Sequence, residues 1–121
     1  MAKTTTKERF IGVDFDCTLA TYTEWTGPED MGEPIKPMVD RVKTWVKEGK
    51  DVRIFSARGK DSYPAMRRWM TKHLGVVLPI TNIKEPAMYA FYDDKAIAME
   101  RNTGEPYSQE NEDDVLDWGD K

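Results

Sequence analysis

The chain has 121 residues, of which 39% are hydrophobic and 33% are charged, and this length and composition suit one compact globular domain. No apolar run approaches the ~18 residues that a membrane-spanning helix needs. Met1–Arg9 is polar and lacks the apolar stretch of a secretory signal. The single cysteine, Cys17, excludes an internal disulfide and a multi-cysteine zinc site. We therefore expect a cytoplasmic protein without a membrane partner.

Charge is unevenly distributed along the chain. The net charge is −4, but residues 105–121 carry seven acidic residues and one basic residue. Residues 1–104 are therefore nearly neutral and offer no broad basic surface for long nucleic acid, although a local basic pocket is not excluded. We divide the chain into a body, residues 1–104, and an acidic C-terminal tail, residues 105–121. Val115, Leu116 and Trp118 leave two interpretations of the tail equally open: it docks on another surface, or it is a loosely packed extension.

The first half of the body predicts a strand, a loop and a helix. Arg9–Phe15 is a short apolar run of the kind that forms a buried strand. Leu19–Lys36 contains two glycines and two prolines, which predicts a loop, with or without a small hairpin. A helix follows, with Pro37 in its first turn and Gly49 just past its end. Apolar residues recur along it at helical spacing, and these are Met38, Val42, Trp45 and Val46.

The second half alternates strands with a helix. Asp51–Phe55 is rich in β-branched and aromatic residues, which favours a second strand. Asp61 or Ser62 is expected to cap a second helix, which carries Pro64 in its first turn and ends at Gly75. The apolar stripe of this helix consists of Met66, Trp69, Met70 and Leu74. Three further strands are expected, at Val76–Ile80 (weakened or placed at an edge by Pro79), at Met88–Tyr92 and at Ala96–Glu100, followed by a turn at Asn102–Gly104.

Strands that alternate with helices predict an α/β fold, here a three-layer Rossmann-like arrangement with a small, mainly parallel sheet. In such sheets the ligand crevice lies at the carboxyl ends of the strands. Polar residues follow each of four predicted strands, namely Asp14 and Asp16, Ser56, Asn82 and Lys84, and Asp93 and Asp94. We therefore expect these side chains to gather at one edge of the sheet.

Four short motifs, in this order, resemble those of the haloacid dehalogenase-like (HAD) superfamily. Phe10–Leu19 is a hydrophobic strand followed by Asp-x-Asp-x-Thr, which resembles the first motif, and Val52–Ser56 resembles the second, a strand that ends in serine or threonine. Lys84 lies where the lysine of the third motif is expected, and Tyr92-Asp93-Asp94 resembles the acidic pair of the fourth. The resemblance implies that residues 1–104 are a HAD-like catalytic domain. Cys17 departs from the commonest pattern, which has glycine there.

The chemistry that the resemblance implies is phosphoryl transfer through a covalent intermediate. A carboxylate such as Asp14 can form an aspartyl-phosphate, which splits one difficult displacement into two easier ones. Asp16 lies two residues further on, which in an extended strand is the same side. From there it can protonate the leaving oxygen and then deprotonate the attacking water. The alternative for both carboxylates is a turn or a helix cap.

A hard divalent cation would offset the repulsion between these carboxylates and a phosphate. We expect Mg²⁺ as the cofactor, since it prefers oxygen ligands, with the Asp14 and Asp93 side chains as direct ligands. The resemblance implies that the backbone carbonyl of Asp16 is a further ligand. Asp94 is expected to act through water or to orient a ligand. The alternative for Asp93 and Asp94 is a solvated turn.

Four side chains are candidates for phosphate binding. Ser56 is expected to donate its hydroxyl to a phosphoryl oxygen, and Lys84 to neutralise the phosphoryl group and the nucleophile. Thr18 is expected to hydrogen-bond locally and hold the loop of the first motif. Arg58, like Lys60, either binds a distal anionic group of the substrate or is a solvent-exposed charge.

Other chemistries fit the sequence poorly. Cys17 is not followed by a phosphate-cradling loop that ends in arginine. His73, the only histidine, lies in the second predicted helix and is expected to be half-buried there. Gly59-Lys60 is not part of a P-loop, because Asp61 follows it and Ile54 occupies the place of the first glycine.

The segment before the first helix is too short for a cap domain. Leu19–Lys36 has 18 residues, and segments below ~40 residues rarely fold alone. We therefore expect an open site, which resembles relatives that act on large phosphorylated substrates. Tyr22, Glu24 and Trp25 make this loop the expected substrate-facing element, since an aromatic there can stack on a nucleobase or equally pack against the body.

Together these features predict a magnesium-dependent phosphomonoester hydrolase, a phosphatase that acts through an aspartyl-phosphate. The expected substrate is a phosphorylated small molecule or nucleotide, or a nucleic-acid end, and a sugar phosphate or a phosphoprotein also fits. Two alternatives stay open: a phosphotransferase, and a catalytically silent interaction module that keeps the fold. The sequence leaves the oligomeric state open.

Overall fold

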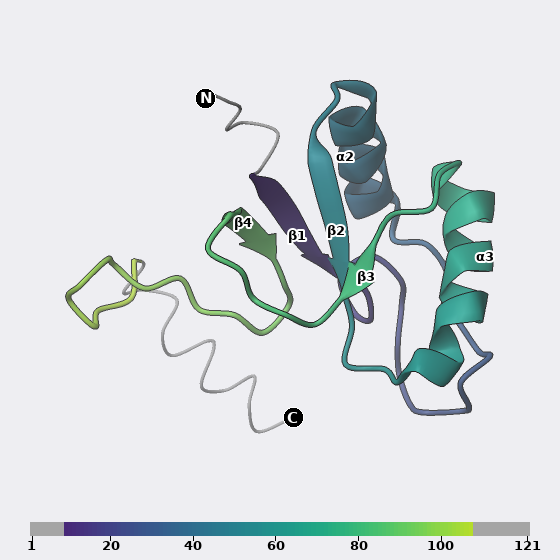
Figure 1. Ribbon diagram of the computed structural model, residues 1–121. Helices are drawn as coiled ribbons and strands as arrows, with labels where there is room; N and C mark the ends of the chain where they lie inside the picture. Colours follow the sequence, from purple (N-terminus) through teal and green to yellow (C-terminus); the bar gives the residue numbers. More distant parts are fainter. Residues whose placement is uncertain (1–8, 108–121) are drawn as a thin grey trace.

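The computed structural model describes residues 9–107, which form a four-stranded sheet with two α-helices and one short 3-10 helix (Figure 1). Along the chain the elements are β1 (Phe10–Asp14), α2 (Lys36–Lys47), β2 (Asp51–Phe55), η1 (Lys60–Ser62), α3 (Tyr63–Leu74), β3 (Ile80–Thr81) and β4 (Met88–Tyr92). The strand order is β3-β2-β1-β4, and every neighbouring pair is parallel. The predicted α/β fold with a small parallel sheet is confirmed.

Proline and glycine mark the ends of both helices, as predicted. Pro37 and Pro64 lie in the first turns of α2 and α3, where a missing N–H costs no helical hydrogen bond. Gly75 adopts a left-handed φ of 77° after α3, and its N–H donates to Met70 O at 3.0 Å. Gly49 adopts a φ of 84° shortly after α2. These left-handed angles favour glycine, so the local sequence determines where each helix stops.

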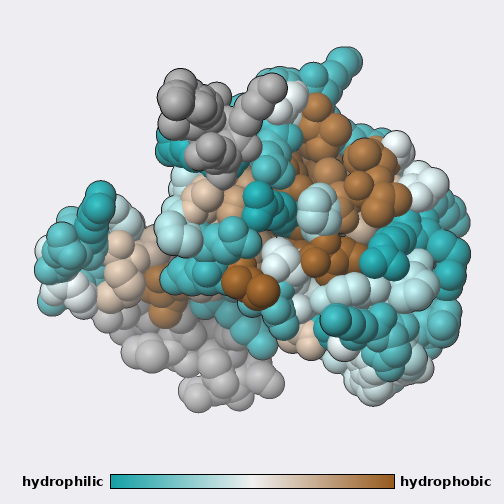
Figure 2. All heavy atoms as spheres, viewed as in Figure 1, coloured by the Kyte–Doolittle hydropathy of each residue, from teal (hydrophilic) through white to brown (hydrophobic). Residues whose placement is uncertain are grey.

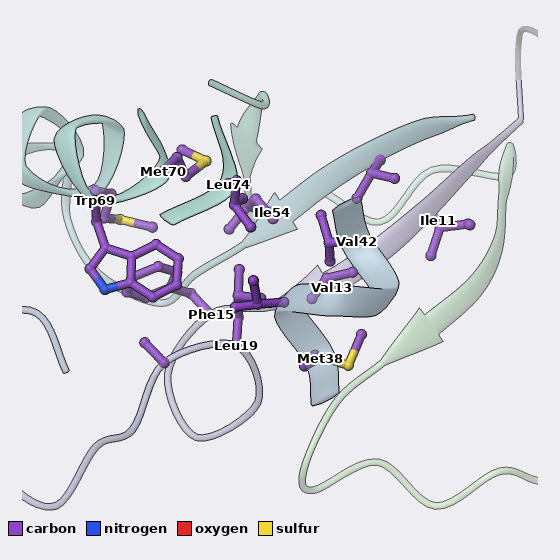
Figure 3. Close-up of a cluster of buried hydrophobic side chains, with 14 residues drawn as sticks. Ile11, Val13, Phe15, Leu19, Met38, Val42, Ile54, Trp69, Met70 and Leu74 are labelled. Carbon is purple, nitrogen blue, oxygen red and sulfur yellow. The ribbon is translucent and has the colours of Figure 1, made fainter. Parts of the chain in front are cut away.

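Both helices pack on the same face of the sheet, and their apolar stripes meet in one buried cluster (Figure 3). Alternate strand residues point to this face, namely Ile11 and Val13 of β1 and Val52 and Ile54 of β2. The helices contribute Met38, Val39 and Val42 from α2, and Met66, Trp69, Met70 and Leu74 from α3. Because residues 9–107 place helices on one face only, the three-layer Rossmann-like arrangement stays a prediction.

Aromatic side chains cover β1 on the opposite face of the sheet. Phe55 stacks on Phe10 with ring centroids 6.4 Å apart, and it contacts Phe91 at 5.0 Å. A Cβ added to Gly12 would lie 2.6 Å from Met88 Sδ and 2.9 Å from atoms of two of these rings. Any side chain at Gly12 would therefore force Met88 and these two rings to shift. Figure 2 shows hydrophobic residues reaching the surface on the side in view.

The third strand is shorter than predicted. The sequence predicts a strand at Val76–Ile80, whereas β3 contains only Ile80 and Thr81, so that boundary is wrong. Pro79 has no N–H to donate, and only its carbonyl takes part in pairing, by accepting from the Ile54 N–H at 2.8 Å. Its position next to β2 at the edge of the sheet agrees with the expectation that proline weakens this strand.

The fifth predicted strand, Ala96–Glu100, does not form, and that prediction is wrong for the described residues. The segment folds back on itself instead: Met99 makes an isolated antiparallel bridge with Pro106, and Tyr107 N–H donates to Ala98 O at 3.0 Å. The predicted turn at Asn102–Gly104 closes this bend, with left-handed φ angles of 67° and 76° at its ends. These backbone groups are therefore satisfied without the sheet.

The loop between β1 and α2 is irregular, as expected, and residues 9–107 contain no cap domain. Thr21 N–H donates to Glu33 O at 2.8 Å, and Glu33 N–H donates to Thr21 Oγ1 at 2.9 Å. Trp69 Nε1 of α3 donates to Gly32 O at 2.8 Å. These bonds close the loop at its base and tie it to the body.

Most of the predicted acidic tail lies outside the described residues, since only its first three positions, 105–107, belong to them. Within residues 9–107 no helix combines the length and the apolar character needed to cross a bilayer.

The variant Met70→Ala is expected to lower the free energy of unfolding by about 2–5 kcal/mol, because it deletes a fully buried side chain between α3 and the sheet. Met99→Ala is the matched control, since Met99 is 47% exposed and its truncation should change stability by less than about 0.5 kcal/mol. Urea denaturation of both variants measures the difference. Equal losses would contradict the placement of Met70 in the core.

Candidate active site

Parallel pairing of β1 with β4 brings two acidic segments together at the carboxyl edge of the sheet. β1 ends at Asp14, and Val13 pairs with Tyr92, the last residue of β4. Asp93 and Asp94 follow directly. The carboxylates of Asp14, Asp93 and Asp94, called the carboxylate cluster below, each offer an oxygen within 4.8 Å of the others. The structure thus brings together three residues that the first and fourth motifs singled out.

The pKa of Asp14 is raised by its position in the cluster. Partial burial raises the pKa of Asp14 from 3.8 to about 7, and a hydrogen bond with Asp94 and the charges of Asp93 and Asp94 act in the same direction. Thr18 Oγ1 donates to Asp14 Oδ2 at 3.3 Å, which lowers the pKa. The raised pKa means that the ionised form of Asp14 is disfavoured beside two other carboxylates. A bound cation would supply the positive charge that stabilises the ionised form.

The backbone after β4 fixes the Asp93 side chain. Its Oδ2 accepts hydrogen bonds from the N–H groups of Lys95 and Ala96, both at 2.9 Å. Such a turn orients an aspartate side chain before any ligand arrives. Three carboxylates that offer hard oxygen donors fit a divalent cation such as Mg²⁺, which binds through a few carboxylates and keeps several waters.

The chain turns sharply after β1. The Phe15 carbonyl accepts hydrogen bonds from the N–H groups of Leu19 and Ala20, both at 2.9 Å, and Cys17 adopts a left-handed φ of 74°. Glycine adopts this angle more readily than cysteine does. Lost hydration and the charges of nearby carboxylates, first among them Asp94, raise the pKa of the Cys17 thiol. The thiolate is therefore disfavoured, in agreement with the rejection of Cys17 as a nucleophile.

Asp16 is paired with Arg58 and its carboxylate is not part of the carboxylate cluster. Arg58 Nε donates to Asp16 Oδ2 at 2.9 Å, and Nη2 donates to Oδ1 at 3.1 Å, so both carboxylate oxygens are engaged. The Arg58 side chain is 6% exposed, so its interpretation as a solvent-exposed charge is wrong. Lys60, by contrast, is exposed.

Ser56 lies directly after β2 and is almost fully buried. Its Oγ accepts the Arg58 N–H at 3.0 Å, which leaves the hydroxyl hydrogen for another acceptor. Donation to a phosphoryl oxygen stays a prediction. The expectation for His73 is confirmed, since it is half-buried in α3 with its ring centroid 4.8 Å from that of Trp69.

A pocket of about 420 Å³ opens beside the carboxylate cluster. Besides the three carboxylates, its lining includes Asp16, Cys17, Tyr22, Trp25, Arg58 and Lys95. Of the three residues that the sequence predicts to face the substrate from the loop between β1 and α2, two line the pocket. These are Tyr22 and Trp25, which are 38% and 55% exposed. Glu24, the third, is exposed and does not line it.

The lysine that lines the pocket is Lys95 and not Lys84. Lys84 is exposed in the connection between β3 and β4 and does not line this pocket. Lys95, which the sequence analysis did not single out, does line it, and its positive charge lowers the pKa of Cys17. The available signal was adjacency, because Lys95 directly follows the acidic pair Asp93-Asp94.

Comparison with known proteins assigns no family to the chain. No family model, no curated protein and no solved structure matches it.

The pKa of Asp14 predicts a pH-dependent stability. Between 3.8 and about 7 the folded protein holds a proton on Asp14 that the unfolded chain releases. The contribution of this group to stability is therefore full below 3.8 and is lost as pH rises to about 7. In metal-free buffer, the variant Asp14→Asn should gain stability relative to the parent across this window and show a constant difference above it. Urea denaturation at stepped pH measures this, and a difference that is constant throughout would contradict the raised pKa.

Proposed function

We propose that the protein is a magnesium-dependent phosphomonoester hydrolase that acts through an aspartyl-phosphate on Asp14. The observation that carries the proposal is the carboxylate cluster beside a pocket, with the pKa of Asp14 raised to about 7. Like charges gathered at a pocket are costly to hold together and are characteristic of functional sites. The four motifs that resemble the HAD superfamily, in their order along the chain, support the same proposal.

The cluster supplies the ligands that such a reaction needs. Asp14 and Asp93 would hold Mg²⁺ directly, the Asp16 backbone carbonyl would be a further ligand, and Asp94 would orient Asp14 through their hydrogen bond. Bound Mg²⁺ would offset the charge of the phosphate and favour the ionised form of Asp14. Ionised Asp14 is then the nucleophile that stands next to the pocket.

Two displacements complete the proposed reaction. In the first, an Asp14 oxygen attacks phosphorus, the bond from phosphorus to the ester oxygen breaks, and Asp16 gives that oxygen a proton. In the second, a water oxygen attacks phosphorus, Asp16 takes a proton from the water, and the bond from Asp14 to phosphorus breaks. Inorganic phosphate leaves, and both side chains return to their starting states.

Asp16 can take this role only after one of its oxygens is released from Arg58 and takes a proton from solvent, since both oxygens accept hydrogen bonds from Arg58 in this structure. Entry of an anionic phosphate gives the Arg58 guanidinium a competing acceptor, which favours that release. Thr18, which donates to Asp14, takes a positioning role at the nucleophile. Ser56, whose Oγ accepts the Arg58 N–H, would donate its hydroxyl hydrogen to a phosphoryl oxygen.

The proposal extends to the organisation of the chain and the class of substrate. We take residues 1–104 as a HAD-like catalytic domain of three-layer Rossmann-like type without a cap, and residues 105–121 as an acidic tail. The open pocket and the aromatic residues at its wall make nucleotides or nucleic-acid ends the favoured substrates.

The variant Asp14→Asn is expected to lower kcat for p-nitrophenyl phosphate by about 1,000-fold or more, because it removes the nucleophile. Asp16→Asn should cost about 100- to 10,000-fold with a poor leaving group. Asp40→Asn is the matched control, since it makes the same chemical change at an exposed ion pair with Lys36. Absence of magnesium-dependent turnover by the parent on a broad panel of phosphate esters would refute the proposal and favour a silent interaction module.

The lysine that neutralises the phosphoryl group can be identified by substitution. We retain Lys84, because it lies where the resemblance places the lysine of the third motif and its side chain is exposed just beyond β3. Lys84→Met should then lower kcat for every ester, by about 100-fold, since it removes charge stabilisation in the transition state. Lys95→Met should have a smaller effect, and the exposed control Lys60→Met none. A larger loss for Lys95→Met would transfer the role to Lys95.

A further inference from the structure

Arg58 connects the proposed proton donor to an exposed aromatic ring. Its Nε and Nη2 hold both oxygens of Asp16, and its guanidinium carbon lies 5.2 Å from the centre of the Trp25 ring. That distance is within the range of a cation–π contact. The Arg58 side chain is 6% exposed, whereas Trp25 is 55% exposed. Trp25 is therefore supported by a buried cation while about half of its surface stays open.

We propose that Trp25 is a stacking platform for a nucleobase, and that the substrate is a nucleoside monophosphate unit. The inference rests on the hydrolase proposed above, which assigns Asp16 to the leaving oxygen. That oxygen must come within hydrogen-bond reach of Asp16. Asp16 and Trp25 both contact Arg58 and all three residues line the pocket, so the alcohol half of the ester lies on the Trp25 side of the pocket.

The chemistry on this side of the pocket favours a planar ring over a second anionic group. Tyr22 and Trp25 both line it and are both exposed. Asp16 holds the Nε and Nη2 donors of Arg58, and the transferred phosphate is already the anion that competes for them, so we expect no second anionic group there. Every base has a π-face that can stack on tryptophan, whereas the sugar alone has none.

One donor on Arg58 remains for the ligand. Its Nη1 is buried and has no hydrogen-bond partner among residues 9–107. A buried donor without a partner is costly, and Arg58 lines the pocket, so an acceptor atom of the bound nucleoside would satisfy Nη1 once Arg58 moves and opens it to the pocket. A base or a ribose carries such acceptors.

The loop that carries Trp25 is anchored before the ligand binds. Thr21 and Glu33 exchange hydrogen bonds across its base, and Arg68 of α3 pairs with Glu29 at 2.9 Å. Cys17 Sγ lies 3.8 Å from the Tyr22 carbonyl, which holds the other aromatic residue next to the first motif. A platform that is held in advance loses less entropy when a base stacks on it.

Calorimetric binding of two ligands tests the platform directly. Adenosine 5′-monophosphate and ribose 5-phosphate share the sugar and the phosphate and differ by the base. We would titrate each into the full-length variant Asp14→Asn with magnesium, so that neither is consumed. We expect adenosine 5′-monophosphate to bind about 5- to 150-fold more tightly, the range that one stacked base gives.

Substitutions at Trp25 then locate the preference. Adding Trp25→Ala should bring the two affinities within about twofold of each other, and Trp25→Phe should keep most of the preference. Tyr89→Ala is the matched control, because Tyr89 is 48% exposed, lies 4.8 Å from the Arg9 guanidinium and is outside the pocket. It should leave the preference unchanged. Two results would overturn the proposal: equal affinities for the two ligands when Trp25 is intact, or a preference for the base that survives Trp25→Ala. The first of these is measured on Asp14→Asn alone, so it does not depend on whether the Trp25 variants fold.

Kinetics separate failure of the platform from failure of the hydrolase. With Asp14 intact, the ratio of kcat/KM for the two esters should follow the same pattern across the Trp25 variants. If the base is preferred in binding but neither ester, nor p-nitrophenyl phosphate, is hydrolysed, the hydrolase is refuted and the platform stands. A short single-stranded oligonucleotide with a terminal phosphate, assayed in parallel, distinguishes a nucleic-acid end from a free nucleotide as the source of the same unit.

Discussion

Backbone pairing between β1 and β4 holds the negative charges of Asp14, Asp93 and Asp94 together against their mutual repulsion. Segments at opposite ends of the described chain meet because β4 joins the sheet next to β1, on the side away from β2 and β3. The aromatic layer around Gly12 and the helices on the other face fix β1 between them. The free energy of packing thus supports an arrangement of charges that would be unfavourable by itself.

The same edge of the sheet provides two different surroundings for its carboxylates. Asp14 lies among other acids, and its pKa rises to about 7. Asp16 has a buried arginine on both of its oxygens. Carboxylates in environments this different are suited to different tasks in one reaction. In the proposed mechanism ligand binding reverses these states: Mg²⁺ would favour the ionised form of Asp14, the nucleophile, and release from Arg58 would let Asp16 hold and transfer a proton.

Local signals in the sequence were sufficient for much of the fold. Proline in the first turn and glycine after the last turn mark both helices, and the apolar periodicity of α3 gives its buried side correctly. The predicted bounds of β4, Met88–Tyr92, are those observed. Two strand predictions were wrong for different reasons. Pro79 has no N–H to donate, and β3 is shorter than predicted. Ala96–Glu100 makes its backbone hydrogen bonds with the residues that follow it and not with the sheet.

The site was predictable only as far as neighbouring residues determine it. Motif order pointed to Asp14, Asp93 and Asp94, because strand ends in a parallel sheet meet at one edge. The ion pair between Asp16 and Arg58 joins positions 42 residues apart, and no local pattern indicates it. Tertiary packing, which the sequence pattern does not describe, likewise decides that Trp25 lies over Arg58.

A crystal structure with magnesium and beryllium trifluoride, a mimic of the phosphoryl group, tests the central claim most directly. The account predicts the mimic bonded to an Asp14 oxygen and one cation within about 2.1 Å of oxygens from Asp14 and Asp93. A cation bound elsewhere, or an Asp93 carboxylate beyond coordinating distance of a cation held by Asp14, would contradict it.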